Sequence, residues 1–271
     1  MEGEAMKEQL YTLVNQTDIS QITDEQLSYM LANLGNPDPI LRDEIIFTLF
    51  ARAFDEEVFT SEQKQAIVEY LLANNCLYEG LGKTSDLTLM RSFTALVLSL
   101  AIDNDAKTTF LTDSLRKELL KAGQAYVFLE NDWRSYDPDK GYIHALAHGS
   151  DLLASCLAHP SCQYDQQLLT KLQNFVIKID RPLYESEAKR LARAVKKLLT
   201  RYPDQAEILT AFETIDVACW KKLESSNGQY YYLDFWQEFL SSLYFLSDQQ
   251  RVKEFCQNKA NDYFTKLGYR D

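Results

Sequence analysis

Apolar residues along this chain recur at intervals of three and four positions, the period of an α-helix. Clear examples are residues 41–50 and 191–199, where charged residues occupy the other faces. We find no convincing run of the two-residue alternation that is typical of a half-buried strand. The pattern predicts an all-α protein of a dozen or so helices joined by short loops.

Three predicted helices begin in a similar way, with an acidic residue followed by Arg. These starts are Asp38–Arg42, Asp86–Arg91 and Glu185–Arg190. Arg42 and Arg91 are 49 positions apart, and Arg91 and Arg190 are 99 apart, so a further unit is expected near Lys140. This period is near that of two-helix repeats. We therefore predict a HEAT-like α-solenoid of antiparallel helix pairs, with an irregular helical bundle as the alternative, and a single elongated domain over residues 1–271.

The composition is that of an ordinary globular protein with an acidic balance. Hydrophobic residues make up 46% of the chain and charged residues 25%, which excludes wholesale disorder. Nine Gly and six Pro are about half the usual usage, which favours helices over an all-β architecture. The net charge of −12 argues against nucleic acid as the partner.

The sequence predicts a cytoplasmic protein without a membrane span. The longest apolar stretch, residues 95–102, has eight residues, whereas a bilayer needs roughly 20. Residues 1–10 contain three Glu and no apolar segment after a basic start, so they do not resemble a secretory signal. The five Cys are an odd, scattered set without C-x-x-C, which fits reduced core thiols better than disulfides or zinc ligands.

The candidate chemistry is concentrated between residues 132 and 151. All three His of the chain fall within sixteen residues, at positions 144, 148 and 159. Asp137 followed by Pro138 is a good helix N-terminus, so we expect a helix from here to about Leu157. Such a helix would carry both His144 and His148.

Helical geometry places the two imidazoles on one face of this predicted helix. At 100° per residue, His148 lies about 40° from His144, and Asp151 lies about 20° away on the other side. His144 and Asp151 are about 10.5 Å apart along the axis, too far to bind one ion together. Gly149 inside the helix suggests a close approach of backbone or ligand at this point.

Three uses of this segment stay open: a pocket for a polar ligand or partner, a metal or catalytic site, and a purely structural role. A divalent metal is the possible cofactor, with His144 and His148 as its ligands. H-x-x-x-H lacks the Glu of H-E-x-x-H, which gives a metalloprotease little support. The predicted ligand-binding residues are Asp132, Trp133, Arg134, Tyr136, Asp137, His144, His148 and Asp151.

The same segment carries a recognisable motif. It reads as an acidic residue, Arg, a small residue and Tyr, then Lys-Gly-aromatic and His-Ala-x-Ala-His-x-x-Asp, over residues 132–151. This segment resembles the hallmark of an uncharacterised bacterial family of helical proteins, catalogued as a domain of unknown function (DUF2785). Ser135 and Tyr142 depart from the pattern, where Gly and Trp are expected. The resemblance implies an all-helical fold and supplies no known activity.

Three hypotheses for the function follow. The first is a binding protein that takes a protein partner or a small anionic ligand, with Arg134 fixing the anion, His148 donating a hydrogen bond or titrating, and Asp151 orienting His148. The second is a metal-dependent hydrolase that uses His144 and His148, completed by Asp132 or Asp137. The third and weakest is nucleic-acid binding through the basic helix 181–201, for which a solvated helix face is the simpler interpretation.

Overall fold

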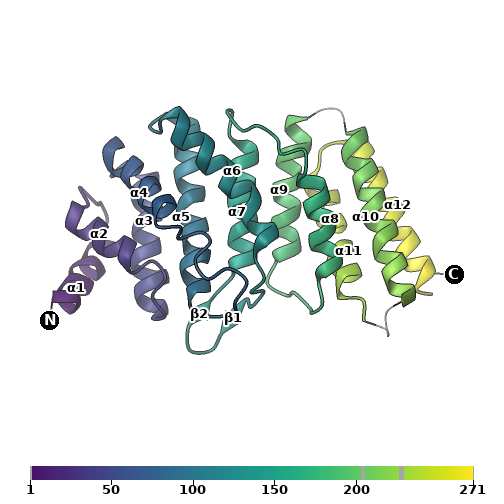
Figure 1. Ribbon diagram of the computed structural model, residues 1–271, viewed down its shortest axis with the longest axis horizontal. Helices are drawn as coiled ribbons and strands as arrows, with labels where there is room; N and C mark the ends of the chain where they lie inside the picture. Colours follow the sequence, from purple (N-terminus) through teal and green to yellow (C-terminus); the bar gives the residue numbers. More distant parts are fainter. Residues whose placement is uncertain (1, 203–204, 226–228, 271) are drawn as a thin grey trace. The chain divides into compact units, whose positions relative to one another are not determined.

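The computed structural model describes residues 2–202, 205–225 and 229–270. Within these residues the chain forms twelve α-helices, one π-helix and two strands of two residues each (Figure 1). The predicted predominance of helix is therefore confirmed. The chain divides into two compact units, Met1–Cys162 and Gln163–Asp271.

The first unit contains the N-terminal helices, a small hairpin and the helix that follows it. Its elements are α1 (Glu2–Val14), α2 (Asp24–Ala32), η1 (a π-helix, Ile40–Phe47), α3 (Thr48–Asp55), α4 (Ser61–Ala73), α5 (Leu87–Lys107), α6 (Asp113–Leu129), β1 (Tyr136–Asp137), β2 (Gly141–Tyr142) and α7 (Ala145–Ala158). The second unit consists of α8 (Leu168–Lys178), α9 (Glu187–Arg201), α10 (Ala206–Ser225), α11 (Tyr231–Leu246) and α12 (Gln250–Lys266).

Local sequence explains where several of these helices begin. Thr23 and Thr60 each accept a hydrogen bond from the backbone N–H three residues later, and a Gln at that position bonds back to the cap. These reciprocal capping boxes satisfy N–H groups that have no partner inside the helix. All three acid-then-Arg segments precede or enter a helix, since η1, α5 and α9 begin beside them.

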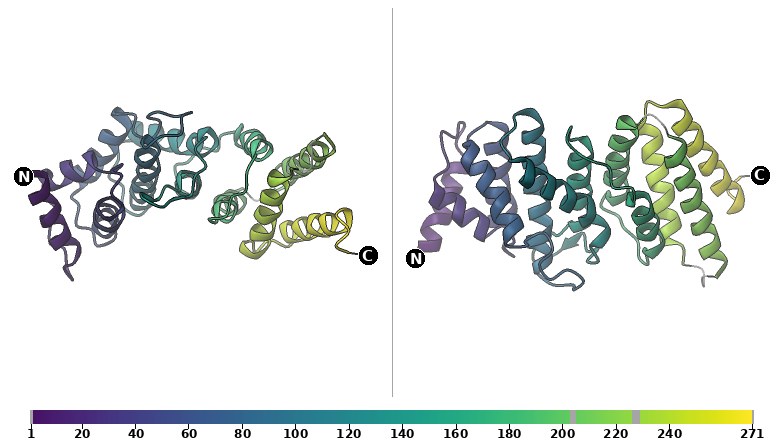
Figure 2. Two further views of the ribbon diagram at one scale, coloured as in Figure 1. Left: turned by 90° about the horizontal axis from the view of Figure 1, so that it is seen from below. Right: turned by 45° about the horizontal axis from the view of Figure 1, so that its top comes forward.

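The core of the first unit forms around α5, which packs against α3, α6 and α7 (Figure 2). Two glycines let α6 and α7 approach each other closely. A Cβ at Gly123 would lie 2.4 Å from Cys156 Sγ, and a Cβ at Gly149 would lie 3.0 Å from the ring of Tyr126. The groups that approach Gly149 closely are side chains of α6, those of Tyr126 and Val127.

The core of the second unit is aromatic. Residues 232–239 of α11 present Tyr232, Phe235, Trp236 and Phe239 to the interior, where all four side chains are buried. Trp236 stacks on Phe239 and donates a hydrogen bond from its indole N–H to Asp216 at 3.2 Å. These four rings fill the core of the second unit.

The helix predicted to begin at Asp137 begins eight residues later. Residues 136–142 form a hairpin in which Tyr136 pairs with Tyr142 and Asp137 with Gly141. Asp137 Oδ1 accepts hydrogen bonds from the backbone N–H groups of Asp139 and Lys140, so this carboxylate stabilises a turn and not a helix start. Gly141 has φ +72°, a left-handed conformation that favours glycine and closes the turn. Among the helices in the described parts of the chain, none is long and apolar enough to cross a membrane.

Candidate functional site

A buried ion pair anchors the segment that leads into the hairpin. The guanidinium of Arg91 donates from Nε and Nη2 to the two carboxylate oxygens of Glu130, at 2.8 and 2.9 Å, and both side chains are fully buried. Glu130 also accepts hydrogen bonds from the hydroxyl of Tyr126 and from the backbone N–H groups of Asn131 and Asp132. The chain after α6 is therefore fixed to α5 at this point.

A second carboxylate continues the network toward the surface. Asp132 accepts hydrogen bonds from the hydroxyl of Thr88, at 2.7 Å, and from Nη2 of Arg134, at 2.6 Å. Burial by itself would raise the pKa of Asp132, but the hydrogen bonds from Arg134 and Thr88 outweigh this effect and lower the pKa below its ordinary value. Arg134 also donates to the backbone carbonyl of Ser85, which ties the loop to the start of α5.

The lowered pKa predicts that Asp132 stabilises the fold at neutral pH and loses this effect in acid. A carboxyl whose pKa is lower when folded contributes its full stabilisation above the unfolded pKa, about 3.9, and loses it as pH falls through the folded pKa. We expect Asp132→Asn to lower the free energy of unfolding at pH 7 by about 1.5–3 kcal/mol, the contribution of a hydrogen bond to a charged group.

Urea unfolding of both proteins at several pH values measures this effect. The difference between their midpoints should shrink as pH is lowered below about 4. Asp139→Asn, at an exposed position of the hairpin, is the matched control. Its urea midpoint should stay close to that of wild type at every pH. A difference between wild type and Asp132→Asn that stays constant from pH 7 to acid would contradict the assignment.

Arg42 of η1 holds the hairpin through hydrogen bonds to its backbone. Its guanidinium is fully buried, and Nη2 donates to the backbone carbonyls of Lys140 and Tyr142, at 2.6 and 3.3 Å. Nη1 donates to the carbonyl of Asn36, and the planar group lies over the ring of Phe93, with its Cζ 4.8 Å from the centroid. One side chain from a distant part of the sequence thus fixes the turn of the hairpin.

The two imidazoles lie next to each other at the base of the hairpin. His144 is the N-cap of α7, in a left-handed conformation with φ 47°, and its ring centroid is 5.6 Å from that of His148. The hydroxyl of Ser92 donates to the carbonyl of Ile143 and lies 2.7 Å from His148 Nδ1. Because a hydroxyl has a single proton, a Ser92 that donates to Ile143 accepts a hydrogen bond from Nδ1–H of His148.

The outer surface of the hairpin is aromatic and flanked by cations. Tyr136 and Tyr142 are 56% and 48% exposed, and their rings meet edge to face with centroids 5.3 Å apart. The ring of Tyr142 in turn stacks on His144, with centroids 4.6 Å apart. The hairpin segment also carries two cations that are each about a third exposed: Lys140, whose Nζ lies 2.6 Å from Asp86 Oδ1, and Arg134, which donates to the carbonyl of Ser85. We call Tyr136, Tyr142, Arg134 and Lys140 the hairpin platform.

In the described parts of the chain, no third ligand joins His144 and His148 to complete a metal site. Residues 2–202, 205–225 and 229–270 contain no group of three or more His, Cys, Asp or Glu side chains that could hold a metal ion. The pairing of His144 and His148 as metal ligands stays a prediction.

The chain matches one known protein family. The family model, described as a protein of unknown function (DUF2785), matches residues 77–245, more than half of the chain. The chain belongs to the DUF2785 family. No curated protein and no solved structure shows significant similarity to it.

The DUF2785 region contains all eight predicted site residues, and the structure gives most of them structural partners. Asp132 and Arg134 bind each other, Asp137 stabilises the turn, and the indole N–H of Trp133 donates to the carbonyl of Glu130. Asp151 lies half-buried on α7, one turn beyond His148. Of the eight, Tyr136 is the one that the structure places among the largely exposed residues.

Sequence reasoning missed several residues that build the site. Arg42 lies before the DUF2785 region, and Thr88, Arg91 and Ser92 lie on α5, far from residues 132–151 in the sequence. The repeated acid-then-Arg helix starts did single out Arg42 and Arg91. Their shared property is complete burial of the guanidinium, which the spacing alone does not reveal.

The basic segment of the DUF2785 region, predicted as one helix over residues 181–201, is helical only from Glu187, as the strongly amphipathic α9, and residues 181–186 lie in the loop before it. Lys189 and Lys196 lie 3.4 and 3.6 Å from carboxylate oxygens of Glu238 and Asp248. Its apolar face is buried, and the first acidic residue of the helix, Glu187, is buried as well. These ion pairs fit the interpretation of a solvated helix face.

Proposed function

We propose that this member of the DUF2785 family is a cytoplasmic binding protein whose hairpin platform receives an anionic group, on a small ligand or on a side chain of a protein partner. The observation that supports it most is the exposure of the Tyr136–Tyr142 pair on a hairpin fixed by fully buried Arg42 and Arg91. Two large aromatic rings held rigidly at the surface lose little conformational freedom on binding, which favours affinity.

The charges beside the rings favour an anion. Asp132 engages Nε and Nη2 of Arg134, so an incoming carboxylate or phosphate would meet the outer edge of the guanidinium. Lys140 adds a second cation on the same side of the hairpin, with its partner Asp86 largely exposed. A planar ligand would stack on a tyrosine ring while its anionic group reaches these two side chains.

Calorimetric titration with phenyl phosphate tests this proposal, since the probe carries both an aromatic ring and an anion. We expect saturable binding in the millimolar range or tighter, which corresponds to about −4 kcal/mol. Binding should be lost in Tyr136→Ser/Tyr142→Ser and retained in Tyr184→Ser, a control whose tyrosine is 81% exposed. Inorganic phosphate should bind more weakly than phenyl phosphate.

The outcome against the proposal is equally definite. Absence of saturable binding by wild type, or an equal loss in the platform variant and the Tyr184 control, would remove the platform as a binding site. Far-UV circular dichroism of each variant shows that its helices are retained. The metal-dependent hydrolase and nucleic-acid binding through residues 181–201 stay predictions that no contact in the described residues favours.

The localisation and the finer architecture belong to the same proposal. All five cysteines are buried, and burial raises the pKa of Cys219 and of Cys256 to about 12, which supports inert core thiols in a reducing compartment. We also propose the HEAT-like α-solenoid over one elongated domain. Packing of α5 on α7 within the first unit and of α9 on α11 within the second supports it, because neighbouring repeats contact through such helix pairs.

A further inference from the structure

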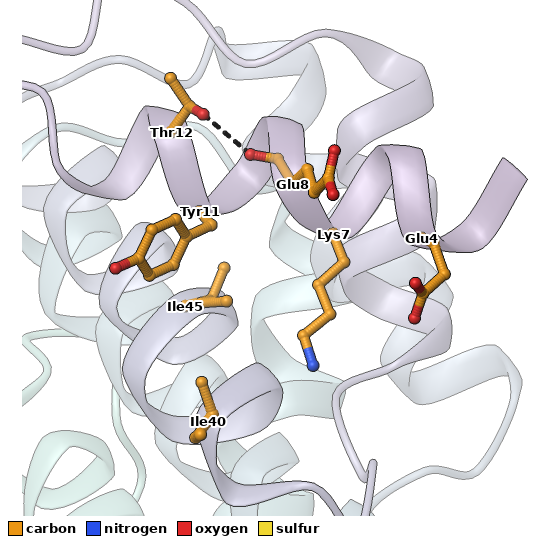
Figure 3. Close-up of a pocket in the computed structure, with 7 residues that line it drawn as sticks. All are labelled: Glu4, Lys7, Glu8, Tyr11, Thr12, Ile40 and Ile45. Atoms are coloured by element: carbon orange, nitrogen blue, oxygen red, sulfur yellow. Dashed lines mark hydrogen bonds between the residues drawn. The ribbon is translucent and has the colours of Figure 1, made fainter. Parts of the chain in front are cut away.

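A groove lies on the first unit between α1 and η1, and none of the four residues of the hairpin platform lines it. Figure 3 shows side chains of α1 on one side of the groove and of η1 on the other. The groove has a volume of about 460 Å³. The residues that line it are Glu4, Lys7, Glu8, Tyr11, Thr12, Ile40 and Ile45. We call it the acidic groove.

Apolar side chains are unusually exposed along this groove. Tyr11 of α1 is 57% exposed and Ile40, the first residue of η1, is 49% exposed, while Ile45 is buried and forms the floor. Figure 3 shows the ring of Tyr11 beside Ile45, with Ile40 farther along η1. A partner that covered these side chains would remove apolar surface from water, which favours association.

The charge of the groove comes from carboxylates. Lys7 is the cation among its lining residues, and its Nζ forms an ion pair with Asp38 Oδ2 at 2.6 Å. This hydrogen bond with Asp38 raises the pKa of Lys7 above its ordinary value, so Lys7 stays charged and its charge is compensated. Glu4 and Glu8, both exposed on α1, then give the groove its net negative charge.

We propose that the acidic groove binds a basic amphipathic helix of a partner protein. Glu4 and Glu8 are one helical turn apart, about 6 Å along α1, which matches Lys or Arg residues four positions apart on a facing helix. The apolar side of that helix packs on Tyr11 and Ile40, as in other helix-in-groove complexes. The same carboxylates repel nucleic acid and anionic membrane surfaces.

Fluorescence anisotropy with a synthetic peptide tests the groove. The probe is a fluorescein-labelled helical peptide with a leucine face and lysines four positions apart, and its counterpart carries glutamate in place of lysine. The full chain should bind the lysine peptide saturably and the glutamate peptide not at all. Because the whole protein carries a charge of −12, general attraction must be separated from binding in the groove.

Charge reversal at matched positions makes this separation. Glu4→Lys/Glu8→Lys should weaken lysine-peptide binding about tenfold or more, since two attractive contacts become repulsive. Glu62→Lys/Glu69→Lys on α4 changes the net charge by the same amount at two exposed positions outside the groove. This control should retain affinity within about threefold of wild type.

Two further variants examine the helix itself and the apolar contact. Glu4→Gln/Glu8→Gln keeps the size of both side chains and should also weaken binding, with the helix content unchanged by circular dichroism. Tyr11→Ser should weaken binding about fivefold to tenfold, because it removes an exposed ring that the peptide covers.

Three results would overturn the proposal: no saturable binding of the lysine peptide, equal losses in the α1 and α4 charge-reversal variants, or an unchanged affinity in Tyr11→Ser. Phenyl phosphate binding at the hairpin platform is measured separately on the same variants. The two sites can therefore fail independently.

Discussion

Arg91→Met is expected to lower the free energy of unfolding of the first unit by about 3–5 kcal/mol, the usual effect of removing one partner from a buried ion pair. The guanidinium contacts both carboxylate oxygens of Glu130, and neither side chain is exposed to solvent. Methionine fills much of the volume but leaves the carboxylate of Glu130 charged and buried. Urea unfolding followed by far-UV circular dichroism measures the change.

The double variant Arg91→Met/Glu130→Gln separates two contributions to the loss of stability: the unpaired buried carboxylate of Glu130, and the packing of the Arg91 side chain. Glutamine is neutral and keeps an oxygen for the backbone N–H groups of Asn131 and Asp132, so the double variant should be more stable than Arg91→Met alone. If Arg91→Met costs less than about 1 kcal/mol, the buried pair does not anchor the loop as described.

Arg42→Met is expected to have the second-largest effect and to act on the hairpin. Its guanidinium supplies the hydrogen bonds of two hairpin carbonyls, those of Lys140 and Tyr142, and a hydrogen bond to a charged group contributes about 1.5–3 kcal/mol. We expect a loss of at least about 3 kcal/mol in the free energy of unfolding. Amide hydrogen exchange of residues 136–144 should accelerate strongly, because the turn loses its anchor.

Arg52→Met is the matched control for this variant. Arg52 of α3 donates to the backbone carbonyls of Val14, Gln16 and Thr17 and to Glu56, so a similar number of hydrogen bonds is lost. None of these acceptors belongs to the hairpin. Exchange at residues 136–144 should therefore stay slow in Arg52→Met, and equal acceleration in both variants would show general loosening of the unit.

The helices were predictable from the sequence because their signals are local. The period of apolar residues in 191–199 corresponds to the buried face of α9. Capping residues such as Thr23 and Thr60 likewise act within one turn of the helix that they begin. These signals depend on side chains a few positions apart, which one sequence displays directly.

The sequence predicts a candidate site within residues 132–151, but the local geometry that it predicts at Asp137 is wrong. Asp137 followed by Pro138 fits a helix start, yet the same carboxylate binds the backbone of a turn, and the left-handed Gly141 decides in favour of the hairpin. The partner that fixes this choice, Arg42, is 98 residues from Lys140 in the chain. Contacts over such separations leave no periodic pattern in a single sequence.

Because η1 anchors the hairpin, the start of the family match differs from the start of the segment that the hairpin needs for its structure. The family match begins at residue 77, whereas the guanidinium that satisfies the turn comes from residue 42. A fragment cut at the family boundary would carry the whole motif yet leave two backbone oxygens without their donor and a ring, Phe93, without its cover. A fragment that preserves the fold of the motif must therefore be longer than the region that the family match covers and must include Arg42.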